Sequence, residues 1–116
     1  MTTAAVIVLC TAPAAGVPGR LGAEDLARTL VEDGFAACVN VVPGVRSWFR
    51  WEGRVDKADE LLLVIKTTAE AAERLQARLL QLHPYQVPEI LEVSVRGGLP
   101  SYLQWLASSV TGPSPS

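Results

Sequence analysis

Cys38 and His83 carry the side chains best suited to bind a metal ion in this sequence of 116 residues. A cysteine thiolate is a soft donor that suits Cu(I), and imidazole is a common ligand of copper and other divalent cations. One cysteine alone does not make a metal site, so Cys38 would have to recruit His83, Glu89 or copies from neighbouring subunits. Alternatively, Cys38 is a small buried apolar residue, and His83 ends a helix as an imidazolium that favours the helix dipole.

His83 also opens a segment with two prolines, His83-Pro84-Tyr85-Gln86-Val87-Pro88-Glu89-Ile90. Each proline fixes φ and lacks a backbone donor, so the segment cannot lie inside a helix or in a central strand. It must be a stiff connector. Side chains on such a connector are held in place, which makes Tyr85 and Glu89 candidate ligand-binding residues. The alternative is a structural elbow with a packed Tyr85.

Lys66 and Trp51 complete the candidate set for a small ligand. Lys66 follows the apolar run Leu61–Ile65 and could hold an anionic group, whereas Glu89 could accept a cation. The two could instead pair with each other. Trp51 and Tyr85 could line a pocket at a subunit interface, or simply fill that interface.

Two enzymatic interpretations have less support. Cys38 and His83 could act as nucleophile and base, but no third orienting group or oxyanion loop is evident. The run Gly16-Val17-Pro18-Gly19-Arg20, together with Asn40, is similar to the phosphate-binding loop and the water-positioning asparagine of acylphosphatases. The match is short. We therefore expect a protein that is not an enzyme and has no organic cofactor.

The composition predicts one soluble domain in the cytoplasm. Hydrophobic residues make up 49% of the chain, and the net charge of −2 includes no run of either sign, so neither nucleic acid nor an anionic membrane is an expected partner. The apolar run at residues 4–10 is too short to cross a bilayer. Two cysteines suit a reducing compartment better than a disulfide scaffold. We expect a domain over residues 1–110 and a disordered tail over residues 111–116.

Hydrophobic periodicity predicts the order β-α-β-β-α-β followed by a last helix. The second and third strands form a long hairpin that turns at Trp51-Glu52-Gly53-Arg54. The second helix begins at a capping box, Thr67-x-x-Glu70. The expected strands are residues 5–9, 35–42 continuing at 45–51 after a break at Pro43-Gly44, 61–65 and 90–95, and the expected helices are residues 23–33, 67–82 and 100–109.

This order is the split βαβ arrangement of ferredoxin-like folds, an α+β class with both helices on one face of an antiparallel sheet. Right-handed crossovers place the third strand between the first and second. Cys10 and Cys38 would then be about 9 to 10 Å apart, beyond disulfide reach, and free. Because the strands are apolar on both faces, we expect oligomerisation through the face without helices. Trp48, Phe49 and Trp51 would lie in that interface or cap one end of the core.

Several separate motifs between Val6 and Leu106 stand in the order seen in one known family. They are Ala36-Ala37-Cys38-Val39-Asn40, Pro43-Gly44, Ser47 with Trp51-Glu52-Gly53, Lys66-Thr67, the connector His83–Ile90, and Tyr102-Leu103-x-Trp105. By these motifs the chain resembles the CutA family of divalent-cation tolerance proteins. Gln86 and Phe49 depart from the family pattern, which usually has Glu and Tyr there. If the missing carboxylate helps to bind a cation, this chain should bind that cation more weakly or bind a different ligand.

The resemblance implies a ferredoxin-like subunit in a tight homotrimer, similar in architecture to the P-II nitrogen-regulatory signalling proteins. It also implies a link to tolerance of copper and other divalent metals. The expected function is a non-enzymatic homotrimer that binds copper, another divalent metal or a small ligand at subunit interfaces, in metal response or signalling. The alternative is a stable trimeric scaffold, or a P-II-like small-ligand sensor, whose effects on metals are indirect.

Overall fold

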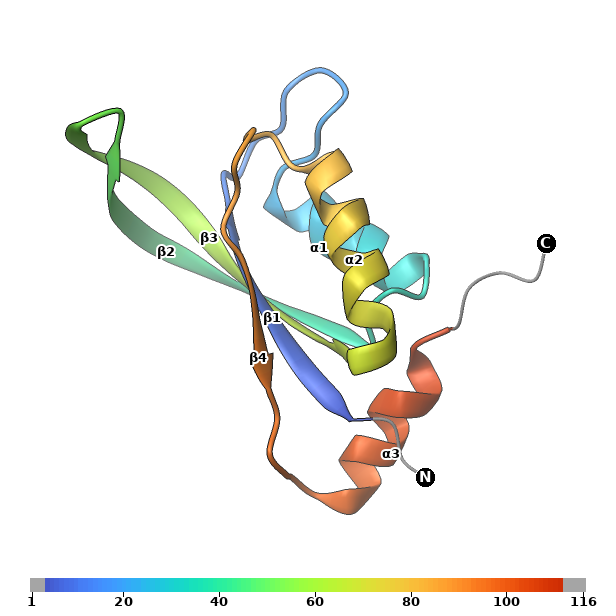
Figure 1. Ribbon diagram of the computed structural model, residues 1–116. Helices are drawn as coiled ribbons and strands as arrows, with labels where there is room; N and C mark the ends of the chain where they lie inside the picture. Colours follow the sequence, from blue (N-terminus) through green and yellow to red (C-terminus); the bar gives the residue numbers. More distant parts are fainter. Residues whose placement is uncertain (1–3, 112–116) are drawn as a thin grey trace.

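Four antiparallel strands form one sheet in the order β2-β3-β1-β4 in the computed structural model, which describes residues 4–111 (Figure 1). The predicted α+β fold is confirmed, with β3 between β1 and β2 as the crossover rule required. The elements are β1 (Ala5–Ala12), α1 (Ala23–Glu32), β2 (Cys38–Trp51), β3 (Arg54–Thr68), α2 (Ala69–Leu82), β4 (Ile90–Ser94) and α3 (Pro100–Ser109).

Helices α1 and α2 cover one face of the sheet, and α3 lies beyond their ends (Figure 1). Alternate residues of β1 and β3 point into the core between this face and the two helices. Its largest members are Val8, Leu26, Leu30, Leu63, Ile65, Leu75 and Leu79, all fully buried. Leu106 fixes α3 by packing on Ala5 and Ala37.

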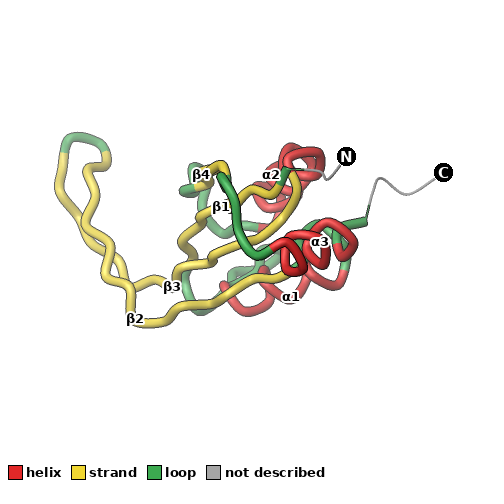
Figure 2. The backbone as a smooth tube through the Cα atoms, turned by 90° about the horizontal axis from the view of Figure 1, so that it is seen from below, coloured by secondary structure: helices red, strands yellow, loops and turns green. Residues whose placement is uncertain are grey.

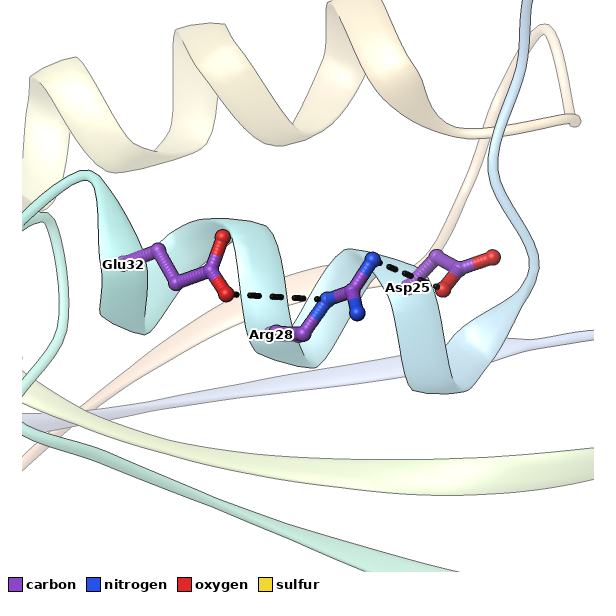
Figure 3. A network of polar contacts seen from close by, with 3 residues as sticks. All are labelled: Asp25, Arg28 and Glu32. Carbon is purple, nitrogen blue, oxygen red and sulfur yellow. Dashed lines mark ion pairs between the residues drawn. The ribbon is translucent and has the colours of Figure 1, made fainter.

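The exposed side of α1 carries a short chain of charges. Arg28 lies between Asp25 and Glu32, with nitrogen-to-oxygen distances of 3.7 Å to each (Figure 3). All three side chains are more than 60% exposed, so solvent screens these pairs and they add little stability. This side of α1 is an ordinary solvated helix surface.

Strands β2 and β3 extend well beyond β1, because the last pair between β1 and β3 is Ala12 with Leu61. Residues 45–60 therefore pair only with each other, and we call them the hairpin arm. The arm projects from the body of the molecule (Figure 2). At its tip Glu52 (φ 50°) and Gly53 (φ 77°) both have positive φ, which is typical of the predicted two-residue hairpin turn.

The prediction that Pro43-Gly44 breaks β2 was wrong. The strand runs continuously from Cys38 to Trp51, and the pair forms a β-bulge where the register shifts between Val42 and Val45. Gly44 adopts a φ of 80°, which only glycine reaches without strain.

The start of β2 and the N-cap of α2 also differ from the prediction, because tertiary hydrogen bonds engage the residues expected there. The N–H groups of Phe35 and Ala36 bind the carbonyl of Leu30 and close the last turn of α1, so β2 begins at Cys38. Thr68, not Thr67, caps α2 by accepting a hydrogen bond from the N–H of Ala71. The Thr67 hydroxyl instead donates to the Phe35 carbonyl over 2.7 Å.

The predicted tail begins one residue too early. Thr111 donates its N–H to the Gly34 carbonyl, and its own carbonyl accepts from Arg74, each over 3.0 Å. Thr111 therefore belongs to the fold. Residues 112–116, for which disorder was expected, lie outside the described residues, as do residues 1–3.

The sheet face opposite α1 and α2 is largely apolar, as predicted. Strand register places Ile7 and Leu9 of β1, Val42 of β2, Leu62 and Val64 of β3, and Leu91 and Val93 of β4 on it. The same register adds Cys38, Asn40 and Lys66, and we call the whole face the open face. Leu91 is 56% exposed and Val93 46% exposed. None of the helices within residues 4–111 has the length and apolar character to cross a membrane.

Candidate functional site

His83 anchors the start of the connector between α2 and β4. Its buried ring lies between two backbone groups: Nδ1 accepts the N–H of Tyr85 over 3.0 Å, and Nε2 lies 2.8 Å from the Thr11 carbonyl oxygen. Since the Tyr85 N–H can only donate, Nε2 carries the proton and donates to Thr11. Burial lowers the pKa of His83, against the opposing effects of the Thr11 carbonyl and the Glu60 charge. His83 ends α2 as predicted, but as a neutral imidazole and not as the expected imidazolium.

Arg20 closes the end of α2 from the opposite side. Its guanidinium donates to the carbonyls of Leu80 and His83, each over 3.1 Å. This role as a C-terminal cap uses the cation that the acylphosphatase interpretation would need for phosphate. The other residue of that interpretation is Asn40, which pairs with Val64 within the sheet. The loop that carries Arg20 follows the end of β1, so the two residues come from different parts of the fold.

A cavity of about 620 Å³ lies between the connector and the hairpin arm. Three of the four residues predicted to bind a small ligand line it: Trp51 from the end of β2, and Tyr85 and Glu89 from the connector. In Figure 1 the connector passes above the point where β2 and β3 leave the sheet. The full lining is Thr11, Ser47, Trp48, Phe49, Arg50, Trp51, Glu60, Tyr85, Gln86, Val87 and Glu89. The volume is within the usual range for small-molecule sites.

Glu60 lines the same cavity and was missed by the sequence analysis. Its side chain is only 6% exposed. Burial of the Tyr85 phenol, its hydrogen bond to Glu60 and the charge of Glu60 together raise the pKa of Tyr85 to about 12. Tyr85 therefore keeps its proton at neutral pH. The available signal was strand alternation, because Glu60 precedes Leu62 and Val64 at the same spacing and shares their face.

The cavity is continuous with the open face. Glu60 pairs with Val45, and Ser47, Phe49 and Trp51 follow Val45 at alternate positions on the same side of the arm. These residues lie on the side opposite α1 and α2. The cavity thus occupies the end of the open face from which the arm projects.

Lys66, the fourth predicted ligand residue, is not part of this cavity. It pairs with Cys38 on the open face, with 4.0 Å between Nζ and Sγ. Glu60 is six positions away along β3, or about 20 Å at the rise of a strand. The ion pairs found within residues 4–111 do not include one between Lys66 and Glu89, so the alternative of a mutual pair was wrong.

Cys38 and His83 are not brought together either. The His83 ring binds Thr11, which pairs with Leu62, whereas Cys38 pairs with Lys66, about 13 Å further along β3. In the part of the chain that the structure describes, no three His, Cys, Asp or Glu side chains gather as they would around a metal ion. The donors of one chain therefore do not make a metal site by themselves.

Both cysteines are free, as predicted from the strand order. Cys10 is fully buried in the core. Burial, followed by the charges of Glu89 and Glu60, raises the pKa of the Cys10 thiol to about 12. The thiol therefore stays protonated at neutral pH and unreactive.

A sheet of this order, with two helices on one face and a long hairpin arm, defines a P-II-like protein of the ferredoxin-fold class. The structure is similar to that of the PII-like protein CutA from Nostoc sp. PCC 7120, with a TM-score of 0.80 and 32% identity, covering 91% of this chain and 97% of that chain. It is also similar to CutA from Xylella fastidiosa, with a TM-score of 0.84 and 37% identity, covering 94% of this chain and 100% of that chain.

The sequence comparisons narrow this class to one family. The profile of the CutA1 divalent ion tolerance protein matches residues 6–109. The divalent-cation tolerance protein CutA of Thermus thermophilus is 46% identical over 100 residues, which is 86% of this chain and 92% of the relative. The chain belongs to the CutA1 divalent ion tolerance family, as its motifs predicted.

Proposed function

We propose that this protein is a non-enzymatic homotrimer of divalent-metal tolerance that takes a metal ion or a small ligand at its subunit interfaces. Membership of the CutA1 family supports the tolerance role. The observation that carries the ligand-binding role is the cavity, because it gathers Trp51, Tyr85 and Glu89 from two distant segments of the chain.

The open face supports the assembly. A sheet with helices on one side only is stable in water when its second face is polar or covered, and here that face is largely apolar. Because the cavity is continuous with the open face, a neighbouring copy packed there would border the cavity. The ligand would then lie at a subunit interface.

Cys38 is the proposed metal-contacting residue. Its thiol lies on the open face, where donors from neighbouring copies would complete a site that one chain lacks. The neighbouring Lys66 ammonium repels a cation, so we expect a soft metal that gains most from sulfur. His83 would have to give up a backbone hydrogen bond to bind metal. Free cysteines favour the reducing cytoplasm as the location.

Titration of Cu(I), Cu(II) and Zn(II) into the purified protein tests the metal site. We expect Cu(I) to bind most tightly and Cys38→Ser to weaken its affinity by about tenfold or more, since the proposed site loses its sulfur donor. His83→Ala tests the second predicted ligand. Cys10→Ala is the matched control, because it removes the buried thiol and should leave affinity unchanged. Equal affinity in Cys38→Ser and the unaltered protein would exclude the proposed site.

The alternative function is a stable trimeric scaffold whose effects on metals are indirect. The separation of Cys38 from His83 favours it, because the two strongest donors of one chain cannot share an ion. A protein that sediments as a trimer but binds none of the three metal ions would support the scaffold and contradict the metal site.

A further inference from the structure

We propose that the cavity between the hairpin arm and the connector binds an organic ammonium cation in preference to a neutral molecule of the same shape. The proposal rests on the small-ligand part of the proposed function and adds the chemical class of the ligand. Three observations support it: the aromatic residues of the cavity walls, the two carboxylates that line the cavity, and the absence of these carboxylates from the ion pairs within residues 4–111.

The walls of the cavity are aromatic. Phe49 and Trp51, on the same side of the arm as Glu60, line it together with Tyr85 of the connector. Trp48 borders it from the other side of the arm, where the Lys57 ammonium lies 5.4 Å from the centre of its ring. Phe49 is 40% exposed and Trp51 52% exposed in the single chain, so neither ring is packed in the core and both can contact a ligand. An alkylated ammonium is attracted to the face of such rings, most strongly to tryptophan, while its methyl groups remove apolar surface from water.

Two carboxylates give the cavity its charge. Glu60 is nearly buried at its wall, and Glu89 follows on the connector. The Tyr85 phenol lies close enough to Glu60 for this carboxylate to raise its pKa. Within residues 4–111, neither Glu60 nor Glu89 takes part in an ion pair. Arg50 is the one basic residue of the lining, and in this part of the chain it forms no ion pair with either carboxylate. A carboxylate taken out of water without a counter-ion is costly, so a cation that enters the cavity relieves that cost.

The same features disfavour the other ligand classes. An anion would face two carboxylates with a single arginine to offset them. A bare divalent ion would find only two oxygen-rich side chains in a space of about 620 Å³, whereas Ca²⁺ or Mg²⁺ prefers six or more oxygen ligands at close range. A neutral apolar molecule would meet the rings but leave Glu60 without a counter-ion. An organic ammonium uses both the rings and the charge.

A matched pair of probes tests the proposal. Choline and 3,3-dimethyl-1-butanol have the same shape and differ by one positive charge. We expect choline to bind about tenfold more tightly, measured by titration calorimetry at fixed ionic strength. The sequence has three tryptophans. Choline should therefore shift the indole N–H resonance of Trp51 and leave that of Trp105, on α3, in place. Equal binding of the two probes, or no binding of choline, would overturn the proposal.

Substitutions then locate the site. Trp51→Leu and Glu60→Gln should each reduce choline affinity, and Trp105→Leu, which alters a similarly exposed tryptophan outside the cavity, should not. Glu89→Gln stands in for Glu60→Gln if the buried substitution prevents folding, because Glu89 is exposed. Undiminished choline binding in Trp51→Leu would contradict the aromatic site.

The test of the ammonium site can be distinguished from the test of the proposed function. Sedimentation and Cu(I) titration are repeated on Glu89→Gln, which leaves Cys38, the open face and the hairpin arm unaltered. Loss of choline binding with assembly and metal binding retained supports the ammonium site. Choline binding by a protein that fails to form trimers or to bind metal supports the site and overturns the assembly or the metal site instead.

Discussion

At the scale of single residues, His83 connects the fold to the cavity. One buried ring joins the end of β1, through the Thr11 carbonyl, to the connector, through the Tyr85 N–H. The same ring lies 4.9 Å from the Tyr85 ring, centroid to centroid. Because Tyr85 lines the cavity and its N–H donates to Nδ1, the tautomer of His83 helps to hold a wall of the proposed ligand site in place.

This arrangement predicts a loss of stability in mild acid. The unfolded chain protonates His83 near its ordinary pKa of 6.5, whereas burial lowers the pKa in the fold. The free energy of unfolding should therefore be fully maintained above pH 6.5 and fall as the pH decreases toward the lowered pKa, by about 1.4 kcal/mol for each unit of the shift. Protonation of Nδ1 would also set two donors against each other at the Tyr85 N–H.

Urea unfolding between pH 5 and 8, at fixed protein concentration, measures this effect. His83→Gln is the matched variant, since an amide can serve both backbone partners without titrating in this range. The drop below pH 6.5 should be smaller in the variant. An identical pH profile for the two proteins would show that His83 is not the group responsible.

The candidate site was partly predictable at this scale. Trp51, Tyr85 and Glu89 could be chosen because residue type and a stiff connector are visible in the sequence. Glu60 could not be chosen from the sequence, because Asp59-Glu60 resembles two ordinary solvent-exposed acidic residues on a hairpin. Its burial depends on the connector, some 25 positions later, folding over it.

At the scale of elements, local sequence signals correctly predicted those helices and turns whose positions do not depend on tertiary contacts. Helix α3 lies at the predicted residues 100–109, and the turn at the tip of the arm has the predicted form. The N-cap of α2 is Thr68 and not the predicted Thr67, because the Thr67 hydroxyl donates to the Phe35 carbonyl, a partner that the local sequence does not reveal. Pro43-Gly44 was taken for a break because a bulge and a strand end share the same residue types.

The turn of the hairpin arm leads to a prediction about stability. Glu52 holds a φ of 50°, a left-handed conformation that asparagine or glycine adopts at lower cost. Glu52→Asn should therefore raise the free energy of unfolding by about 0.5 to 1 kcal/mol. Gly53→Ala, at φ 77°, should lower it by a similar amount.

Thermal and urea unfolding of both variants at one protein concentration test this pair. The two shifts should have opposite signs, because one substitution relieves a strained φ and the other creates one. Since the side chains lie at the exposed tip, neither change alters the core. Destabilisation by Glu52→Asn would show that the glutamate side chain contributes more than its backbone costs.

At the scale of the whole molecule, the chain has the shape of a subunit. Its radius of gyration is 14.8 Å, whereas a compact domain of this length has about 13 Å. The difference comes from the hairpin arm, which carries exposed Trp48, Trp51 and Val55 away from the body (Figure 2). Exposed aromatic side chains on the arm and a largely apolar open face on one chain are typical of protein surfaces that become covered on assembly.

A charge placed on the open face should therefore prevent assembly without unfolding the chain. Leu91 is 56% exposed in the single chain, so Leu91→Asp costs the isolated subunit little. In a trimer built through this face, each of three copies would bury an unpaired carboxylate, at about several kcal/mol each. Leu80→Asp is the matched control, because Leu80 is 48% exposed on α2, away from the open face.

Sedimentation at micromolar concentration distinguishes the outcomes, with circular dichroism to verify folding. We expect a trimer for the unaltered protein and for Leu80→Asp, and a folded monomer for Leu91→Asp. The aromatic cavity should persist in that monomer, since every residue that lines it comes from one chain, but without a neighbouring copy at its border. A trimer that survives Leu91→Asp would place the subunit interface on the hairpin arm or on α3, and a monomeric unaltered protein would contradict assembly through the open face.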